Sequence, residues 1–541
     1  MPHASLTFVV SYWPPHLPRT LPLATITLQQ CLQASAAHNP DNTAIAFFGR
    51  DITYRRLQQE VEAFAGWLRN RAGVKPGDRV VIYMQNSPQW VIAYYGVLRA
   101  GAIVVPVNPM NRAAELQRYI DDSGAEVAVC AQELFEFAKA RFREIVVATY
   151  ADYLPAQPAF DLPDWITAPP HAFDTGHPWS TALAADEVPL ASAVNPGDHA
   201  ILNYTSGSAG EPKGCRHTHR SFLHSTAGLS LWHGHSPATV FLGVAPMYQI
   251  AGLVNSLNCA IYSGGTLVPL PRWDRTLAAQ LIDRYRITFA GLAPAAIADL
   301  LDHPGLSKYN LSSLTRISSG GSTMPKPLWD RIQSTLGLPF IEVYGMTEAG
   351  TIAINPIERP KPQCLGVPFF NADVRILHSG EIAVRGPQLF EGYWNRPEAD
   401  AEAFTEIDGH RYFRTGDIGS ADDEGYLYMT DRLKRMINAA GYKVWPAEVE
   451  AVLAQHPDVL EACVIAARDP RRGETVKALV VLRSGVAAPE PSTLIEWSRQ
   501  RMAAFKYPRI IQFVPALPKS PAGKILWREL QDRESPGSPG L

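Results

Sequence analysis

The chain lacks several features that would each point to a particular class of protein. Its six cysteines are widely scattered and form no Cys-x-x-Cys pair, which argues against a disulfide framework and against a zinc site. The 49 lysines and arginines are balanced by 52 acidic residues, so no basic domain suggests a nucleic-acid partner. These absences are typical of a globular protein in a reducing compartment, and we expect a cytoplasmic location.

Long hydrophobic runs are also missing. No segment approaches the roughly 20 apolar residues that span a bilayer, so we expect any membrane contact to be peripheral. The apolar stretch near the N-terminus has no basic segment before it and prolines directly after it, which argues against a signal peptide. At 541 residues, the chain has the length of roughly two to four structural units.

Two series of alternating strands and helices are predicted from hydrophobic periodicity. In the first, residues 80–83 and 103–106 resemble buried strands, and residues 54–71 and 87–99 resemble helices. Such alternation predicts βαβ units in a largely parallel sheet. The second series covers residues 240–343, where apolar segments at 287–292, 317–319 and 340–343 are each followed by a turn rich in Gly or Ser. Ligands collect at the carboxyl ends of parallel strands, so we expect these three turns to share one cleft.

The pattern changes after residue 366. Short strands with turns are predicted up to Asp431, at residues 374–376, 381–384 and 426–428. After the charged stretch that begins at Arg432, an α+β pattern follows, with a helix over 446–455 and strands over 462–466 and 476–482. We therefore place a domain boundary between Asp431 and Arg432.

The segment with the clearest chemistry is the decapeptide TSGSAGEPKG at residues 205–214. Its glycines allow main-chain N–H groups to approach an anion, its hydroxyls add donors, and Lys213 supplies a positive charge. It is not a Walker A loop, because Lys213 is followed by Gly214 and Cys215 rather than by a hydroxyl residue. Taken alone, the segment is more typical of a flexible surface loop.

Five further polar segments follow in order: SSGGS at 318–322, YGMTE at 344–348, RTGD at 414–417, DRLK at 431–434 and PKSPAGK at 518–524. Together with the decapeptide they closely resemble the adenylate-forming superfamily of acyl-CoA synthetases, luciferases and peptide-synthetase adenylation domains. The resemblance covers about residues 45–530. It implies an α/β fold with a large N-terminal domain, residues 1–431, that combines parallel-rich αβαβα sheets with a small β-barrel-like subdomain. It further implies a small mobile α+β domain, residues 432–541.

The resemblance implies a role for each matching residue in a reaction that uses ATP, Mg²⁺ and CoA. Lys524 would bridge the substrate carboxylate and the α-phosphate, Thr347 would contact that phosphate, and Glu348 would bind Mg²⁺. Lys434 matches the hinge, and Gly441 matches the glycine that faces the pantetheine tunnel. The remaining nucleotide contacts fall to Thr205, Ser206, Gly207, Ser208, Gly210 and Lys213 at the phosphates, Gly320, Gly321, Ser322, Tyr344 and Gly345 at the adenine, and Asp417 and Arg432 at the ribose.

The sequence departs from the family pattern at two places. Ala209 stands where a third hydroxyl is usual, which should weaken ATP binding by about 1 kcal/mol. Tyr248 and Gln249 replace the Phe-His pair of the family, so a titratable gate at this position is in doubt, and both are kept only as acyl-pocket candidates. No aspartate follows Tyr248, which disfavours an amino acid substrate.

The leading hypothesis is an ATP-dependent acid:CoA ligase that releases AMP and pyrophosphate. Small and apolar residues around residues 247–252 suit an uncharged acyl tail. The stretch at residues 437–448 most resembles bacterial medium- or long-chain fatty acyl-CoA ligases, and this resemblance implies a fatty acid substrate. An aryl-CoA ligase and an acyl-AMP ligase that loads a carrier protein stay open as alternatives, as does a non-catalytic nucleotide-binding protein. The residues also leave the oligomeric state open, a homodimer included.

Overall fold

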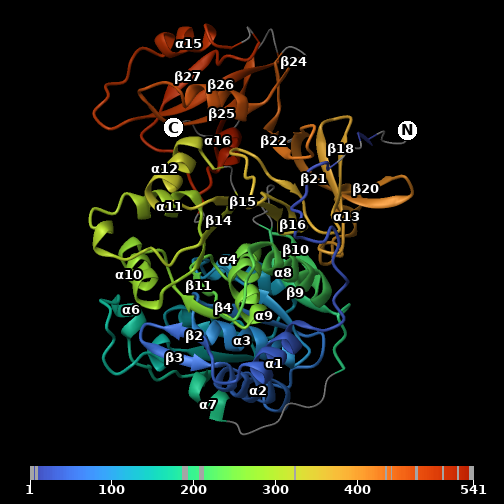
Figure 1. The fold of residues 1–541 in the computed structure, drawn as a ribbon, viewed down its shortest axis with the longest axis vertical. Coiled ribbons are helices and arrows are strands. Elements are labelled where there is room, and N and C mark those ends of the chain that lie inside the picture. The colour runs from blue at the N-terminus through green and yellow to red at the C-terminus, as the bar shows by residue number, and fades with distance from the viewer. Residues whose placement is uncertain are drawn as a thin grey trace. The chain divides into compact units, whose positions relative to one another are not determined.

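The structure is a computed structural model that describes residues 5–6, 10–184, 193–205, 212–321, 324–432, 435–439, 442–469, 473–502, 505–520 and 523–534. The chain divides into two compact units (Figure 1). The larger comprises residues 10–373 and 384–405, and the smaller comprises residues 1–9, 374–383 and 406–541. Among the described residues, no helix is long and apolar enough to cross a membrane.

The larger unit contains a seven-stranded sheet with the order β10-β9-β5-β4-β6-β7-β8. Its neighbouring strands run parallel except β10, which pairs antiparallel with β9. The predicted strands at 80–83 and 103–106 are confirmed as β4 and β5. The bounds are β4 Arg79–Tyr83, β5 Ile103–Pro106, β6 Val127–Ala131, β7 Glu144–Ala148, β8 His177–Pro178, β9 His199–Tyr204 and β10 Gly214–Thr218.

A nine-stranded sheet, with the order β17-β16-β15-β14-β13-β11-β12-β2-β3, forms the second layer of this unit. Its six central strands are parallel, and β13, β14 and β15 are neighbours, so the three turns predicted to share a cleft lie at one edge. The bounds are β2 Thr43–Phe47, β3 Arg50–Thr53, β11 Val240–Gly243, β12 Thr266–Pro269, β13 Phe289–Gly291, β14 Arg316–Gly320, β15 Phe340–Met346, β16 Gly350–Ile354 and β17 Val367–Pro368.

Helices cover both sheets. The predicted helices begin at side-chain caps: Thr53 Oγ1 accepts from the Arg56 amide before α2 (Tyr54–Asn70), and Ser87 Oγ accepts from the Trp90 amide before α3 (Pro88–Arg99). Helix α8 (His219–His233) contacts strands of both sheets and so lies between them. The other helices named here are α1 (Leu28–His38), α9 (Cys259–Ser263), α10 (Arg275–Tyr285), α11 (Pro294–Leu301) and α12 (Lys326–Leu336).

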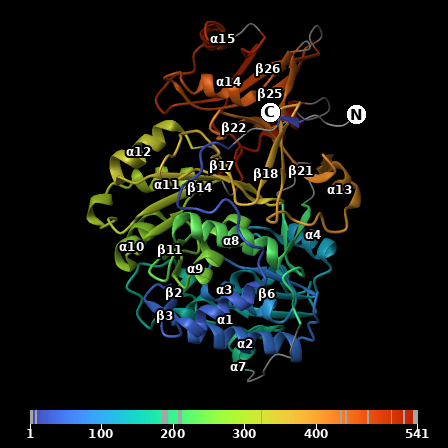
Figure 2. The same ribbon diagram turned by 45° about the vertical axis from the view of Figure 1, so that its right-hand side comes forward.

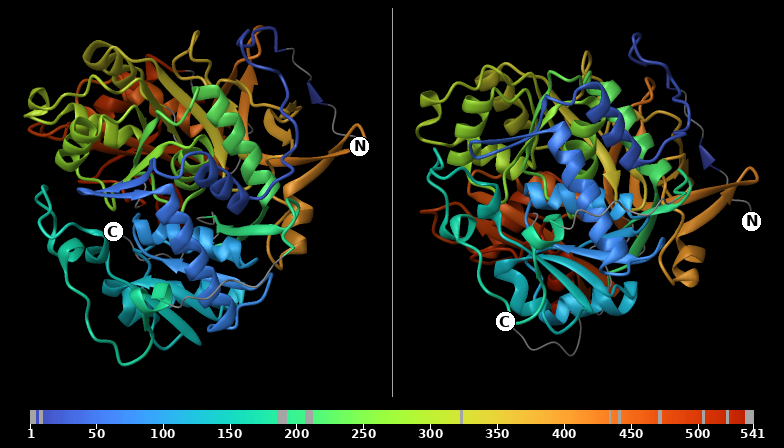
Figure 3. Two further views of the ribbon diagram at one scale, coloured as in Figure 1. Left: turned by 60° about the horizontal axis from the view of Figure 1, so that its bottom comes forward. Right: turned by 90° about the horizontal axis from the view of Figure 1, so that it is seen from below.

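The figures show how these helices are layered. Figure 2 places α10, α11 and α12 on one side of β11 and β14, and α8 and α9 on the other. Helix α1 packs against α8 and α9, and in both views of Figure 3 the blue N-terminal helices lie beside the green α8. The arrangement agrees with the layered α/β architecture that the sequence predicted.

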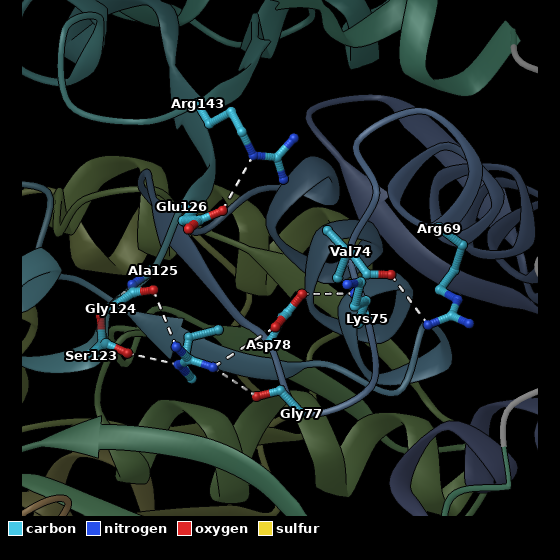
Figure 4. A network of polar contacts seen from close by, with 11 residues as sticks. Arg69, Val74, Lys75, Gly77, Asp78, Ser123, Gly124, Ala125, Glu126 and Arg143 are labelled. Carbon is cyan, nitrogen blue, oxygen red and sulfur yellow. Dashed lines mark hydrogen bonds and ion pairs between the residues drawn. The ribbon is translucent and has the colours of Figure 1, made fainter.

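A polar network fixes the amino ends of two parallel strands (Figure 4). Arg79, the first residue of β4, donates from Nε to the Ser123 carbonyl (2.7 Å) and from its terminal nitrogens to the Gly124 and Gly77 carbonyls. Gly124 ends a helix with a φ of +64°, a conformation that favours glycine.

The smaller unit contains two sheets. One has the order β1-β18-β19-β21-β20, with β22 paired to β21, and the other has the order β24-β23-β26-β25, with β27 paired to β26. The bounds are β1 Ser5–Leu6, β18 Asp373–Leu377, β19 Glu381–Arg385, β20 Phe404–Ile407, β21 His410–Ala421, β22 Leu427–Arg432, β23 Ile437–Ala439, β24 Tyr442–Val444, β25 Val459–Asp469, β26 Gly473–Leu482 and β27 Ile510–Phe513.

The second of these sheets carries the predicted α+β core. Helix α14 (Pro446–Leu453) buries Val449 and Leu453 against Val464 of β25 and Val480 of β26. The helix over 446–455 and the strands over 462–466 and 476–482 are therefore confirmed. The boundary between Asp431 and Arg432 stays a prediction, because it concerns a movement of the last 110 or so residues rather than their packing.

Candidate active site

The described ends of the decapeptide, Thr205 and residues 212–214, lie at the end of one strand and the start of the next. Strands β9 and β10 pair antiparallel with Tyr204 opposite Gly214, and the Thr205 amide donates to the Lys213 carbonyl at 3.0 Å. The ends of the predicted phosphate loop are thus held together, as a compact anion-binding turn requires. The predicted loop residues Ser206, Gly207, Ser208 and Gly210 lie outside the described residues.

One face of β10 points toward the turn that carries Thr347 and Glu348. Side chains alternate along a strand, so Lys213, Cys215 and His217 share a face. His217 is buried, and its Nε2 donates to the Thr347 carbonyl at 2.6 Å. Burial lowers the pKa of His217 to about 4, which keeps the ring neutral near pH 7. His217 therefore anchors the predicted catalytic turn to the phosphate-loop hairpin, a contact that sequence reasoning missed.

Glu348 is held from a second segment, residues 390–393. The Phe390 amide donates to the Glu348 carbonyl (2.8 Å), and the Tyr393 hydroxyl donates to Glu348 Oε1 (3.0 Å). The Lys213 ammonium lies over the ring of Tyr393, 5.0 Å from the ring centre. Lys213 and Glu348, distant in sequence, are therefore brought to the same tyrosine, which the sequence did not single out.

The predicted adenine residues lie at the carboxyl ends of β14 and β15. Gly320 is the register partner of Val343, one residue before Tyr344. A Cβ on Gly320 would lie 2.6 Å from the Val343 carbonyl oxygen, and one on Gly345 would lie 2.2 Å from the Gly350 carbonyl oxygen. Only glycine fits such close approaches. Gly321 follows with a φ of +83°, whereas Ser322 lies outside the described residues.

Glu342 is a further buried group that sequence reasoning missed. It points to the same face of β15 as Tyr344, two residues later, and is 3% exposed. Burial raises its pKa to about 8, although a hydrogen bond with the Met324 main chain opposes the shift. A carboxyl group that stays protonated near pH 7 can donate a hydrogen bond. The only signal in the sequence is an acidic residue within an apolar strand.

The acyl-pocket candidates Tyr248 and Gln249 follow β11 and lie beside β9. Asn203 Nδ2 donates to the Tyr248 carbonyl at 3.1 Å, and the Gln249 amide closes a turn onto the Pro246 carbonyl at 3.0 Å. Burial raises the pKa of Tyr248 to about 12, so its phenol is neutral. A π-helical turn, η3 (Gly252–Asn258), comes next, a feature frequent at functional sites.

Asn86 holds this segment in place and gives a testable consequence. Its Nδ2 donates to the Gly243 and Ala245 carbonyls, and its Oδ1 accepts from the Met247 amide (2.9–3.0 Å). We expect Asn86→Ala to lower the free energy of unfolding by about 3 kcal/mol and to raise the KM of the acid, because buried main-chain groups lose their partners. Urea unfolding and acid titrations measure both. Asn355→Ala, which removes an equally buried asparagine bonded to Lys361, should lower stability without changing that KM.

In the smaller unit, Asp417 and Arg432 are brought together. They are Cα partners across β21 and β22, and Asp417 is 1% exposed. The residues of β21 that precede Asp417 are held by Glu381, whose Oε1 accepts from the Gly416 amide (3.1 Å) and whose Oε2 accepts from Arg414 (2.7 Å). The main chain thus brings the two predicted ribose residues to adjacent positions, although the Arg432 side chain lies outside the description.

Lys524 lies on an exposed turn of the same unit. The Ser520 amide donates to the Lys524 carbonyl at 2.7 Å, the Lys524 amide donates to Ser520 Oγ at 3.2 Å, and Gly523 has a φ of +76°. A short antiparallel bridge between Lys519 and Ile525 closes the turn. Lys434 and Gly441, predicted as hinge and tunnel residues, lie outside the described residues.

At the predicted Mg²⁺ site, the protein would supply one carboxylate, that of Glu348, rather than a complete set of ligands. Among the described residues, no group of three or more His, Cys, Asp or Glu side chains could hold a metal ion. Mg²⁺ is commonly bound by one or two carboxylates together with substrate phosphates and water. Glu348, close to the lysine of the phosphate loop, fits that mode.

Comparison with known proteins supports the same chemistry. The family model for the AMP-binding enzyme matches residues 32–394, and that for the AMP-binding enzyme C-terminal domain matches residues 448–524. The chain is 34% identical to a long-chain-fatty-acid–CoA ligase of Bacillus subtilis (97% of each chain covered) and 33% identical to a feruloyl-CoA synthase of an Amycolatopsis species (92% of this chain and 97% of that protein). The crystal structure of the anthranilate CoA ligase AuaEII in complex with anthranoyl-AMP matches with a TM-score of 0.81 at 25% identity, covering 95% of this chain and 98% of the other.

Proposed function

This chain belongs to the family of AMP-binding enzymes, within the adenylate-forming superfamily, and is an ATP-dependent, AMP-forming acyl-CoA synthetase. On that premise we propose that its acid substrate is a medium- or long-chain fatty acid. ATP and CoA are its co-substrates. The observation that carries the proposal is the segment after β11, where buried Met247 and Leu253 flank Gln249-Ile250-Ala251-Gly252 and no ionised side chain is present. The activity of the Bacillus subtilis relative on long-chain fatty acids supports it.

An aromatic acid is the second candidate. The half-buried, neutral phenol of Tyr248 lies on the same segment and offers a ring for stacking. The feruloyl-CoA synthase and the anthranilate CoA ligase are relatives whose named acids are aromatic. A substrate panel separates the two candidates.

In the first half-reaction, a carboxylate oxygen of the acid attacks the α-phosphorus of ATP, and pyrophosphate leaves. Two like charges repel by about 4 kcal/mol at about 4 Å with an effective dielectric of 20, so catalysis requires cations and positioning. We assign Lys524 to the carboxylate and the α-phosphate, and Thr347 to the α-phosphate. Lys213, with Thr205, Ser206 and Ser208 and the main chain of Gly207 and Gly210, would hold the β- and γ-phosphates.

Glu348 would hold Mg²⁺, which supplies Lewis-acid neutralisation of phosphate charge when bound. The hydrogen bond from the Tyr393 hydroxyl favours one orientation of the Glu348 carboxylate. Tyr344 would stack on the adenine, with Gly320, Gly321, Ser322 and Gly345 allowing the base to approach the main chain. Asp417 would accept from the ribose hydroxyls and Arg432 would donate beside it.

In the second half-reaction, the CoA thiol attacks the carbonyl carbon of the acyl-adenylate and AMP leaves. We propose that residues 432–541 turn about Lys434 between the two steps, so that Lys524 withdraws and Gly441 faces the pantetheine channel. A Cβ at Gly441 would obstruct that channel. We further propose a cytoplasmic location, which is supported by six free, buried cysteines.

A substrate panel with CoA, scored by pyrophosphate release, tests the proposed acid. We expect octanoate and palmitate to exceed benzoate and 4-hydroxycinnamate in kcat/KM by at least about tenfold, because each buried methylene contributes about 0.8 kcal/mol. A preference for the aromatic acids would favour the second candidate. Thioester formation without any carrier protein would eliminate a carrier-loading ligase, and no release with any acid would contradict the proposal.

A further inference from the structure

Tyr393 is held against the phosphate-loop hairpin by its main chain. Residues 391–394 run antiparallel beside β10, and the Trp394 amide donates to the Gly214 carbonyl at 2.7 Å. Cys215 lies directly opposite Tyr393 in this pairing. Because main-chain hydrogen bonds set the register, the position of the tyrosine does not depend on its side-chain contacts.

The register explains why the ring reaches Lys213. Lys213 precedes Cys215 by two residues and so points to the same face as Tyr393, at the diagonal position that long and aromatic side chains can bridge. The ammonium lies 5.0 Å from the ring centre, within the range of a cation–π interaction. Tyr393 is 8% exposed, so little water competes for this contact.

The hydroxyl of the same side chain is directed to Glu348. It donates to Oε1 at 3.0 Å, so the hydrogen bond fixes one oxygen of the Glu348 carboxylate. The tyrosine amide is fixed as well, since it donates to Asp400 Oδ1 at 2.7 Å.

We propose that Tyr393 is a positioning residue for the adenylation half-reaction, which orients the Glu348 carboxylate through its hydroxyl and the Lys213 ammonium through its ring face. The inference rests on the roles proposed above for Glu348 and Lys213. It assigns two separable functions to one side chain, because the hydroxyl and the ring can be removed one at a time.

Two substitutions separate these functions. Tyr393→Phe keeps the ring and removes the donor to Glu348, and we expect the Mg²⁺ concentration for half-maximal pyrophosphate release to rise by about tenfold or more, as for partners that orient a metal ligand. The same variant should bind ATP in the presence of EDTA within about twofold of the unchanged protein, because the ring still holds Lys213. Tyr393→Leu should weaken this metal-free binding by about tenfold in isothermal titration calorimetry.

A matched control exists elsewhere in the same unit. The Tyr153 hydroxyl donates to Glu60 Oε2 at 2.7 Å, and both side chains are buried. Tyr153→Phe removes the same type of hydrogen bond, so it should lower thermal stability about as much as Tyr393→Phe. It should change neither the Mg²⁺ requirement nor the metal-free affinity for ATP.

The outcomes decide between a positioning and a merely structural tyrosine. An Mg²⁺ requirement of Tyr393→Phe equal to that of Tyr153→Phe overturns the hydroxyl function, even if Tyr393→Leu does not fold. Equal metal-free affinities of the Phe and Leu variants overturn the ring function. Glu348→Gln and Lys213→Met test the underlying roles separately. If both variants retain full activity, the proposed roles of Glu348 and Lys213 fail. If both lose activity while Tyr393→Phe is unaffected, only the inference about Tyr393 is refuted.

Discussion

Lys524→Ala is expected to slow acyl-adenylate formation by at least about 10²-fold, the usual cost of losing one group that stabilises transition-state charge. The second half-reaction, started from preformed acyl-AMP and CoA, should keep most of its rate. The asymmetry arises because a cation between carboxylate and α-phosphate is needed only while these two anions react. Rapid-quench measurements of the separate half-reactions give both rates.

The neighbouring Lys519 provides the control. It is exposed, lies five residues earlier, just before the same turn, and forms an ion pair with Glu461. Lys519→Ala should leave both half-reactions nearly unchanged, since exposed ion pairs contribute little. An equal loss of both half-reactions in Lys524→Ala would show that the lysine supports the fold or CoA binding instead.

Acidification is expected to destabilise the larger unit steeply below pH 6.5. Burial lowers the pKa of His217 and His219 to about 4 and that of His233 to about 3. The folded state thus keeps these rings neutral, whereas the unfolded chain binds protons once the pH falls below 6.5. Their contribution to stability is complete above that pH and declines below it by about 1.4 kcal/mol per pH unit for each histidine, or about 6 kcal/mol in total between pH 7 and pH 5.

Urea unfolding at pH 7, 6 and 5 measures this decline, and one variant isolates a single residue. His233 packs against Phe289 at 5.1 Å between ring centres, and neither of its ring nitrogens has a hydrogen-bond partner among the described residues. His233→Phe should therefore reduce the pH slope by about 1.4 kcal/mol per unit. His171→Gln, at an exposed position, should leave the slope unchanged. An unaltered slope in His233→Phe would mean that this ring is not held neutral.

Much of the larger unit was predictable because local pattern and tertiary structure agree there. The strands at β4 and β5 and the helices α2 and α3 were predicted within one or two residues, since apolar runs of four to five residues alternate with capped helical stretches. Gly320 and Gly345 were predicted as site residues from the resemblance, and that role stays a prediction. The structure adds that each lies in close contact with a neighbouring carbonyl group.

The contacts that join separate motifs could not be predicted. Tyr393 lies 45 residues after Glu348 and meets it only because residues 391–394 pair with β10, a register that no local pattern encodes. His217 appears in the sequence as one more histidine, and its bond to Thr347 depends on the packing of two sheets. Glu342 was overlooked because an acidic residue in a strand is usually exposed, whereas this one is buried.

The most direct test of the account follows the oxygen atoms of the acid. When a fatty acid labelled with ¹⁸O in both carboxylate oxygens is incubated with the enzyme, ATP, Mg²⁺ and CoA, one label should appear in AMP and one in the acyl-CoA. This distribution follows because a carboxylate oxygen bonds to the α-phosphorus and leaves with AMP when the thiol attacks. Mass spectrometry of AMP that shows no ¹⁸O would contradict the account, since the carboxylate would then not have attacked the α-phosphorus.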